Sequence, residues 1–229
     1  LMGAVIGDKV RLISHVVIDG NTSIGAGCVI YPFACVGTLT QDLKYAGAKT
    51  FVSIGERTTL REYVTVHSST IEGETTRVGN DCSILAYCHI AHECKVGNGV
   101  IMSNCSQLAG HVTIEDEVGV GGMVGVHQFV RIGRMAFVGG FTRISQDVPP
   151  FFIVEGNPAV ARGLNSVGLK RRNIDQAARD SLKEAYRLLC RENLSTTQAI
   201  EKIRAELKSC PEIEQLVGFI QSSERGVTK

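Results

Sequence analysis

Four histidines lie close together in this sequence. They are His89, His92, His111 and His127, and Glu93 directly follows the second of them. A histidine, which titrates near neutral pH, can remove a proton from a hydroxyl group, and an adjacent carboxylate can orient the ring and stabilise the imidazolium. A lone histidine is usually structural, but a group of histidines beside a carboxylate favours a site for proton transfer.

A period of six predicts the elements that position these histidines. Large aliphatic residues occupy 21 of the 24 positions whose number is a multiple of six, from Ile6 to Ile144. This period fits neither a helix nor a hairpin, but it fits short strands separated by bends, each with one aliphatic side chain pointing inward. Glycine often follows the aliphatic residue, and we expect it to relieve the backbone at each bend. Three such strands, and therefore three periods, close one coil, and stacked coils form a parallel β-solenoid.

Residues separated by three periods should therefore stack in adjacent coils, about 4.8 Å apart. His92 then lies in one column with Gly110 and Gln128, and Glu93 lies in the next column with His111. A base and a backbone N–H group one strand spacing apart suit acyl transfer, because the amide can stabilise a developing oxyanion. No serine or cysteine is clearly placed as a covalent nucleophile, so direct attack by the acceptor is the simpler scheme.

The extent of the repeat defines the domains. We expect a parallel β-helix over residues 1–150, a connecting segment at 151–172 and an α-helical domain at 173–229. In the last of these, polar capping residues and a proline favourable for a first helical turn mark helix starts. The predicted helices begin near Asp175, after Ser195 and at Pro211.

Interruptions of the repeat predict two excursions from the solenoid. The period fails at Asp42, Ala48 and Glu72, which places the excursions near residues 38–51 and 68–77. The first combines charged residues with an aromatic ring, which favours a functional loop over a tolerated insertion. The period is already in phase at the first aliphatic position, so we expect further coils to precede this chain.

Composition and charge restrict the class of protein. The chain has 229 residues, of which 44% are hydrophobic and 21% charged, and its net charge is +1. This balance is typical of a globular protein and excludes a disordered chain or a protein that binds polyanions, such as nucleic acid, along its whole length. No apolar run approaches the length needed to span a membrane, so we expect no membrane-spanning helix. Residues 160–229 hold 13 Lys and Arg against 9 Asp and Glu, which suggests an acidic partner or a phosphate ligand.

Three cysteines flank the first two histidines. Cys82, Cys88 and Cys94 recur at the six-residue period. Each lies two residues before a periodic aliphatic residue, at a position where we expect small side chains to point inward. This spacing favours core packing over metal ligation. No CxxC pair or secretion signal occurs, so we expect reduced cysteines, a cytoplasmic location and neither a metal nor another cofactor.

A family resemblance covers the chain in seven segments. They lie in order at residues 41–47, 89–94, 108–111, 126–129, 146–150, 168–172 and 223–226. These segments closely resemble the UDP-N-acetylglucosamine O-acyltransferases, a family of hexapeptide-repeat acyltransferases, and residues 123–133 are most similar to its chlamydial branch. The resemblance implies a left-handed parallel β-helix and a homotrimer with active sites between subunits. It also implies transfer of a (3-hydroxy)fatty acyl group from acyl carrier protein to the 3-hydroxyl of UDP-N-acetylglucosamine, the first step of lipid A biosynthesis.

The resemblance also assigns roles to individual residues. His92 matches the general base, Glu93 its acidic partner, where the family usually has Asp, and Gly110 the oxyanion-binding amide. Gly140 matches the position that gauges acyl length, where a small residue leaves the groove open to long chains. Pro158 stands where some members have His, so we assign no ligand contact there. The substrate-binding positions are Asp42, Lys44, His89, His111, His127, Gln128 (beside the acyl chain) and the nucleotide contacts Asn165, Arg171 and Arg172.

Three other functions stay open. The clustered histidines could hold zinc between subunits, as in a γ-type carbonic anhydrase of the same fold. A sister N-acyltransferase of the same pathway acts on an amine, but it does not share the sequence of residues 41–47. A non-catalytic solenoid scaffold explains the repeat but not the polar columns.

Overall fold

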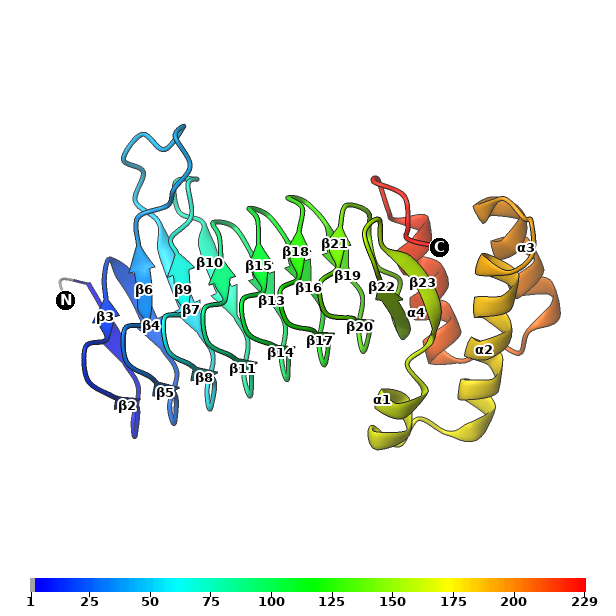
Figure 1. Cartoon of the computed structure of the whole chain (residues 1–229), viewed down its shortest axis with the longest axis horizontal. Helices are drawn as coiled ribbons and strands as arrows, with labels where there is room; N and C mark the ends of the chain where they lie inside the picture. Colours follow the sequence, from blue (N-terminus) through cyan, green and yellow to red (C-terminus); the bar gives the residue numbers. More distant parts are fainter. Residues whose placement is uncertain (1–2) are drawn as a thin grey trace.

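The structure, a computed structural model, describes residues 3–229 and consists of a long solenoid of short strands followed by helices (Figure 1). A regular coil contributes one strand to each of three sheets, and strands of adjacent coils pair in parallel. Where no loop intervenes, paired residues are three periods apart in the sequence, so that His89 pairs with Gln107. The predicted fold class, a left-handed parallel β-helix followed by a helical domain, is confirmed.

The solenoid strands form sheets A, B and C, one on each side of a triangular coil. Sheet A contains β1 (Val5–Ile6), β4 (Asn21–Ile24), β7 (Phe51–Ile54), β10 (Thr75–Val78), β13 (Lys95–Val96), β16 (Thr113–Ile114) and β19 (Arg131–Ile132). Sheet B contains β2 (Arg11–Leu12), β5 (Val29–Ile30), β8 (Thr59–Leu60), β11 (Ser83–Ile84), β14 (Ile101–Met102), β17 (Gly119–Val120), β20 (Phe137–Val138), β22 (Phe152–Glu155) and β23 (Val160–Leu164). Sheet C contains β3 (Val17–Ile18), β6 (Cys35–Thr38), β9 (Thr65–His67), β12 (His89–Ile90), β15 (Gln107–Leu108), β18 (Gly125–Val126) and β21 (Arg143–Ile144).

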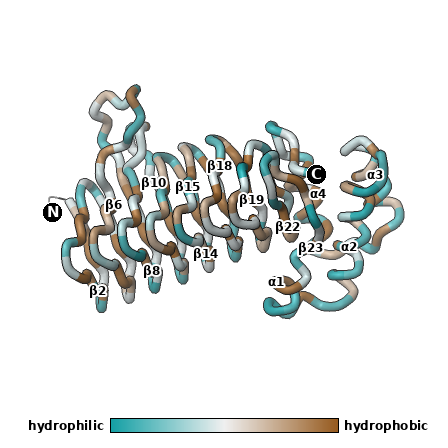
Figure 2. Tube along the Cα trace, viewed as in Figure 1, coloured by the Kyte–Doolittle hydropathy of each residue, from teal (hydrophilic) through white to brown (hydrophobic). Residues whose placement is uncertain are grey.

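The core of the solenoid is built from the aliphatic residues of the six-residue period. From Ile18 to Ile144, each of these side chains is at most 5% exposed. Figure 2 shows the hydrophobic positions recurring from coil to coil. Burial of one such side chain stabilises the fold by roughly 1.5–3 kcal/mol, so the repeated inward position holds the coils together.

The predicted role of the glycines that follow the aliphatic residues is wrong for most of them. At Gly55, Gly79 and Gly97, φ lies outside the left-handed region. A Cβ atom at Gly97 would lie only 2.5 Å from Asp116 Oδ1 in the next coil, so these glycines permit close approach of coils. The left-handed φ falls two residues later, on non-glycine residues such as Glu93.

Two loops leave the solenoid on the same side, at the turns that join sheet C to sheet A (Figure 1). The first loop, residues 39–50, connects β6 to β7, and the second, residues 68–74, connects β9 to β10. The Lys49 amide donates to the Glu72 carboxylate (2.7 Å), and the Gly73 amide donates to the Lys49 carbonyl (3.0 Å). The loops therefore support each other over one corner of the solenoid.

A hairpin and helices follow the last coil. Strand β22 adds to sheet B in parallel with β20 and pairs antiparallel with β23, a hairpin that the period does not predict. The helices are α1 (Ser166–Arg171), α2 (Gln176–Cys190), α3 (Thr196–Glu206) and α4 (Pro211–Gln221). The predicted starts of the last three are confirmed, because Asp175 caps α2, Ser195 caps α3 and Pro211 opens α4. None of the helices within residues 3–229 is long and apolar enough to cross a membrane.

The core-packing prediction for three cysteines is confirmed. Cys82, Cys88 and Cys94 are at most 1% exposed, and each thiol donates to a carbonyl of the following coil at 3.1 Å. Burial raises the pKa of Cys88 to about 11 and that of Cys94 to about 12. These thiols therefore behave as small apolar side chains.

Candidate active site

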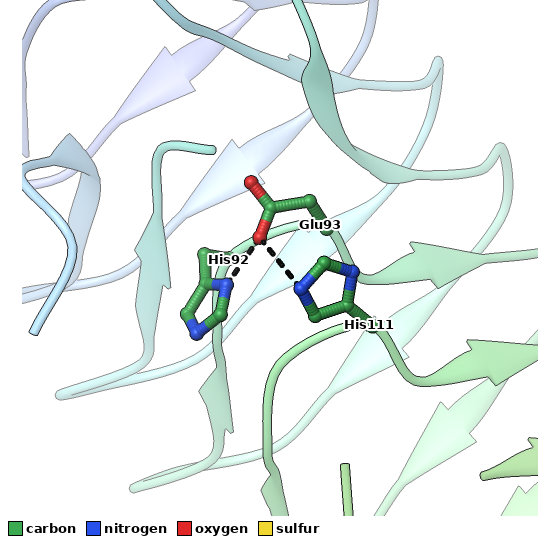
Figure 3. A group of neighbouring side chains, drawn as sticks. All are labelled: His92, Glu93 and His111. Carbon is green, nitrogen blue, oxygen red and sulfur yellow. Dashed lines mark hydrogen bonds and ion pairs between the residues drawn. The ribbon is translucent and has the colours of Figure 1, made fainter. Parts of the chain in front are cut away.

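The clustered histidines meet at the turns between sheets C and A, which we call the C–A corner (Figure 3). His92 and Glu93 form the turn between β12 and β13, and His111 lies in the corresponding turn of the next coil. The second residue of each turn, Glu93 or His111, has a left-handed φ, 54° or 61° respectively. The short strands and their inward residues fix both turns, so these side chains are held on a rigid frame.

A hydrogen bond joins His92 Nδ1 to Glu93 Oε2, and it lies mostly out of solvent. The His92 side chain is 16% exposed and that of Glu93 is 7% exposed. The other carboxylate oxygen accepts hydrogen bonds from the Ser69 hydroxyl and from both the amide and the hydroxyl of Thr70. The second loop thus orients Glu93. Sequence reasoning missed Ser69 and Thr70, although a run of consecutive hydroxyl residues at the break in the period was a signal.

The ionisation of Glu93 follows from these contacts. Burial alone would raise the pKa of Glu93, but the hydrogen bonds from Ser69, Thr70 and His92 outweigh it and hold the pKa at about 2. A carboxylate can only accept hydrogen bonds, so Nδ1 of His92 carries the hydrogen in this pair. The opposite nitrogen, Nε2, is then the atom that can take a proton from a substrate.

Gly110 lies directly against the His92 ring, as the column prediction requires. A Cβ atom at Gly110 would lie 2.3 Å from Cε1 of His92, so any side chain there would displace the ring. The Gly110 amide donates no hydrogen bond to a residue within 3–229. The structure therefore places an N–H group without a protein acceptor beside the candidate base, as an oxyanion-binding amide must be.

His111 and Asp42 complete the surroundings of His92. Nε2 of His111 lies 3.4 Å from Glu93 Oε2, and its ring is nearly perpendicular to that of His92 (Figure 3). Asp42 Oδ2, from the first loop, lies 3.9 Å from Nε2 of His92. Lys44 is exposed, and its amide donates to the Asp42 carboxylate. The first loop thus reaches the proton-accepting side of the ring.

His89 lies nearby, on strand β12, in a more apolar setting. Its Nδ1 atom is 2.7 Å from the Thr65 hydroxyl, and its ring packs edge-on against His67. Burial, followed by the proximity of His67 and His92, lowers the pKa of His89 to about 4. Burial and then His92 also lower the pKa of His67, a buried residue that sequence reasoning missed. Both rings are therefore neutral near pH 7.

His127 and Gln128 lie further along the same corner, and both are exposed. His127 lines a groove on the outer face of sheet C together with His89. Because His92 and Gln128 occupy the same column two coils apart, this pair lies roughly 10 Å from the base. The structure thus brings Asp42, His89, His92, Glu93, Gly110, His111 and His127 to one side of the solenoid.

The predicted nucleotide contacts do not join this cluster within one chain. Helix α1 lies over sheet B, where Arg171 and Arg172 line a pocket together with Phe137. Arg172 lies 3.3 Å from Glu117 in an ion pair. Asn165 is the N-cap of α1 and also donates to the Met135 carbonyl, so its side chain holds the helix in place.

Gly140 lies at a third location, in a turn between sheets B and C. A Cβ atom there would lie 3.3 Å from the Gly122 carbonyl, and its φ is outside the left-handed region. The backbone conformation therefore does not require glycine at this position.

The side chains of His92, Glu93 and His111 also have the spacing of a possible metal site. Ligand atoms of His92, Glu93 and His111 lie within 4.8 Å of one another. However, Glu93 already accepts hydrogen bonds at both oxygens, an arrangement that suits an oriented base.

Comparisons with known proteins agree with the sequence motifs. The model of a family described as "Udp N-acetylglucosamine O-acyltransferase; Domain 2" matches residues 147–228, and a bacterial transferase hexapeptide model matches residues 75–110. An acyl-[acyl-carrier-protein]--UDP-N-acetylglucosamine O-acyltransferase of Thermodesulfovibrio yellowstonii is 48% identical over 98% of this chain and 87% of its own length. The enzyme of the same name from Gloeothece citriformis is 46% identical over 91% of this chain and 75% of its own length.

A solved structure shows the same similarity in three dimensions. The UDP-N-acetylglucosamine acyltransferase from Bacteroides fragilis superposes with a TM-score of 0.95 and 32% identity, over 99% of this chain and 96% of that one. The resemblance predicted from the seven segments is confirmed. The chain therefore belongs to the UDP-N-acetylglucosamine O-acyltransferase family.

Proposed function

We propose that this protein transfers a fatty acyl group from acyl carrier protein to the 3-hydroxyl group of UDP-N-acetylglucosamine, the first step of lipid A biosynthesis. The observation that carries the proposal is the His92–Glu93 pair held against Gly110 at the C–A corner. The names of the relatives support the same reaction, since they specify acyl-[acyl-carrier-protein] as donor and UDP-N-acetylglucosamine as acceptor.

His92 acts as the general base in this mechanism. Nε2 takes the proton from the 3-hydroxyl group while the hydroxyl oxygen attacks the thioester carbonyl carbon. Glu93 holds the opposite ring nitrogen and stabilises the imidazolium, and the Gly110 amide donates to the oxyanion of the tetrahedral intermediate. The carbon–sulfur bond then breaks, and His92 returns the proton to the leaving thiolate. No covalent acyl-enzyme forms.

The acceptor sugar lies beside the first loop in this proposal. Asp42, 3.9 Å from the proton-accepting nitrogen, positions a sugar hydroxyl, and the exposed Lys44 supplies positive charge for the phosphates. His111 and His127 contact the sugar or its phosphates, and Gln128 lies near the 3-position of the acyl chain. His89 lines the adjacent groove as a neutral ring.

A homotrimer brings the remaining contacts to the site. Arg171 and Arg172 lie over sheet B, the side of the triangular coil opposite the C–A corner. We assign them to the active site of a neighbouring subunit, where two guanidinium groups suit the diphosphate of the nucleotide. Asn165 acts with them by fixing α1.

Mixing inactive variants tests this assembly. His92→Ala and the double variant Arg171→Ala/Arg172→Ala are each expected to be impaired, and co-assembled trimers are expected to regain activity. Recovery requires that some sites combine the intact histidine of one subunit with the intact arginines of another. Two differently tagged His92→Ala chains provide the control. Failure of co-assembled trimers to recover any activity would contradict sites shared between subunits.

The donor and the cellular location follow from charge and redox chemistry. Acyl carrier protein is acidic, and the excess of Lys and Arg in residues 160–229 offers it a complementary partner. The cysteines within residues 3–229 are unbridged, which suits the reducing cytoplasm, where we place the enzyme.

An acyl-transfer assay tests the proposed reaction. Carrier-bound acyl chains of graded length, with and without a 3-hydroxyl, are offered with UDP-N-acetylglucosamine or its 3-amino analogue. We expect an ester product on the hydroxyl sugar. Transfer to the amino sugar alone would overturn the proposal in favour of an N-acyltransferase.

The spacing of the histidine trio calls for a test against the zinc enzyme. Acyl transfer is expected to survive exhaustive chelation, because both ring nitrogens of His92 bind or transfer protons in the proposed mechanism and neither ligates a metal. Carbon dioxide hydration that disappears with chelation and returns with zinc would favour a γ-type carbonic anhydrase instead.

A further inference from the structure

The chain beyond α4 turns back and binds the helical end of the solenoid (Figure 1). Asp147 and Val227 form a parallel bridge, in which the Asp147 amide donates to the Gly226 carbonyl (3.0 Å) and the Thr228 amide donates to the Asp147 carbonyl (2.8 Å). The Asp147 side chain is 1% exposed and accepts from the Ser223 hydroxyl at 2.8 Å. The segment on both sides of Arg225 is therefore fixed.

This anchoring directs Arg225 to the groove on sheet C. Its Nη2 atom lies 3.3 Å from His127 Nδ1 and 3.3 Å from the Ser145 carbonyl. Its Nε atom is buried and has no hydrogen-bond partner within residues 3–229. Within residues 3–229 only Nη2 of the guanidinium has protein partners, so Nη1, next to Nη2 and close to His127, is left without a protein acceptor.

The end of the groove is positively charged. Arg143 lines the groove and is exposed, whereas Arg225 reaches it through its contact with His127. Neither arginine forms an ion pair within residues 3–229. No carboxylate is among the lining residues. Two guanidinium groups without acidic partners favour an anion, and their planar forks match phosphate oxygens.

We propose that Arg225, together with Arg143, binds a phosphate group of a substrate at this end of the groove. The inference rests on the proposed acyltransferase function. His127 lies two coils from His92, roughly 10 Å away. The acceptor carries its diphosphate on the same sugar ring as the reacting hydroxyl, so this distance suits the nucleotide diphosphate. The phosphodiester of the carrier protein's pantetheine arm is the other source of the same chemistry.

Steady-state kinetics of Arg225→Gln distinguishes the two sources. We expect KM for UDP-N-acetylglucosamine to rise roughly tenfold with little change in kcat, as for the loss of a charge-assisted hydrogen bond. Arg225→Lys should lie between the variant and the wild type, since it keeps the charge but loses the fork. Arg11→Gln, at the other end of the solenoid, is the matched control.

Each outcome bears on the proposal. A rise in KM for acyl carrier protein instead would assign the cations to the pantetheine phosphate. Unchanged KM values for both substrates in a folded, trimeric variant would overturn the inference. If Arg225→Gln fails to fold, Arg143→Gln provides the same test, because the Arg143 side chain is exposed. A wild-type enzyme without acyl-transfer activity would instead refute the proposed function itself.

Discussion

Two corners of this solenoid share one backbone conformation but carry different side chains: clustered titratable residues at one, and a stack of mainly aromatic rings at the other. At the C–A corner the second turn residue, Glu93 or His111, has a φ of 54° or 61°. At the turns that join sheet B to sheet C, which we call the B–C corner, Tyr63 and Tyr87 have φ values of 59° and 63°. The turn conformation therefore does not decide which corner becomes a site.

The side chains and loops make the difference. At the B–C corner His15, Phe33, Tyr63 and Tyr87 form a regular stack, with ring centroids 4.8–5.1 Å apart. At the C–A corner both loops leave the solenoid, and the second of them binds the carboxylate of Glu93. The inward aliphatic residues build both corners alike, so outward turn residues are free to vary, and loops convert one set of them into a site.

The largest expected effect is the loss of the proposed base, His92. His92→Ala should lower kcat by roughly 10²–10⁴, because general base catalysis contributes about that factor. His15→Ala, which removes a histidine from the B–C corner, should retain activity. Turnover numbers and the oligomeric masses of both variants check the prediction, and near-normal turnover in a folded His92→Ala variant would refute the assignment.

The next effect concerns the contact between Gly110 and the proposed base. Gly110→Ala places a methyl group 2.3 Å from His92 Cε1, so the ring must move. A displacement of about 1 Å can cost on the order of 10²-fold in rate, and we expect a loss of that size in kcat. Gly163→Ala, where a Cβ atom meets nothing within 4 Å, is the control. Equal activity of the two variants would show that the close approach has no role in catalysis.

Much of this comparison was predictable from the sequence. The six-residue period predicts which residues form the core. It also predicts that His92 contacts Gly110, because in parallel stacked coils the sequence separation alone determines which residues are neighbours. The contacts of Ser69 and Thr70 with Glu93 were not predictable, since they depend on how a loop folds back. The contact of Arg225 with His127 was not predictable either, because it joins residues 98 positions apart and depends on how the chain folds back.

A third prediction concerns the stability that Glu93 provides. Its pKa is about 2 in the folded protein, below the value of about 4.3 in an unfolded chain, so the ionised group stabilises the fold above about pH 4.3. That contribution is lost as pH falls from about 4.3 toward 2. Glu93→Gln should therefore lower the free energy of unfolding at pH 7 by roughly 1–3 kcal/mol, and by less at pH 3. Urea unfolding at both pH values checks this, with Glu201→Gln, exposed on α3, as the control. An equal loss at both pH values would contradict the charge-based explanation.

The smallest expected effect tests whether the B–C corner serves the acyl chain. Gly140 adopts a backbone conformation open to other residues, and a Cβ atom there meets only the Gly122 backbone within 4 Å. The glycine leaves space outside the turn, and because a Cβ atom would lie only 3.3 Å from the Gly122 carbonyl, a larger residue also requires a small shift of the neighbouring coil. A methionine would fill this space, and each buried methylene is worth about 0.8 kcal/mol. An acyl chain that loses the burial of two methylene groups should therefore lose roughly tenfold in preference relative to a shorter chain. Gly140→Met should thus favour shorter acyl chains in direct competition between long and short carrier-bound substrates. An unaltered ratio in a folded variant would show that this corner, unlike the C–A corner, has only a structural role.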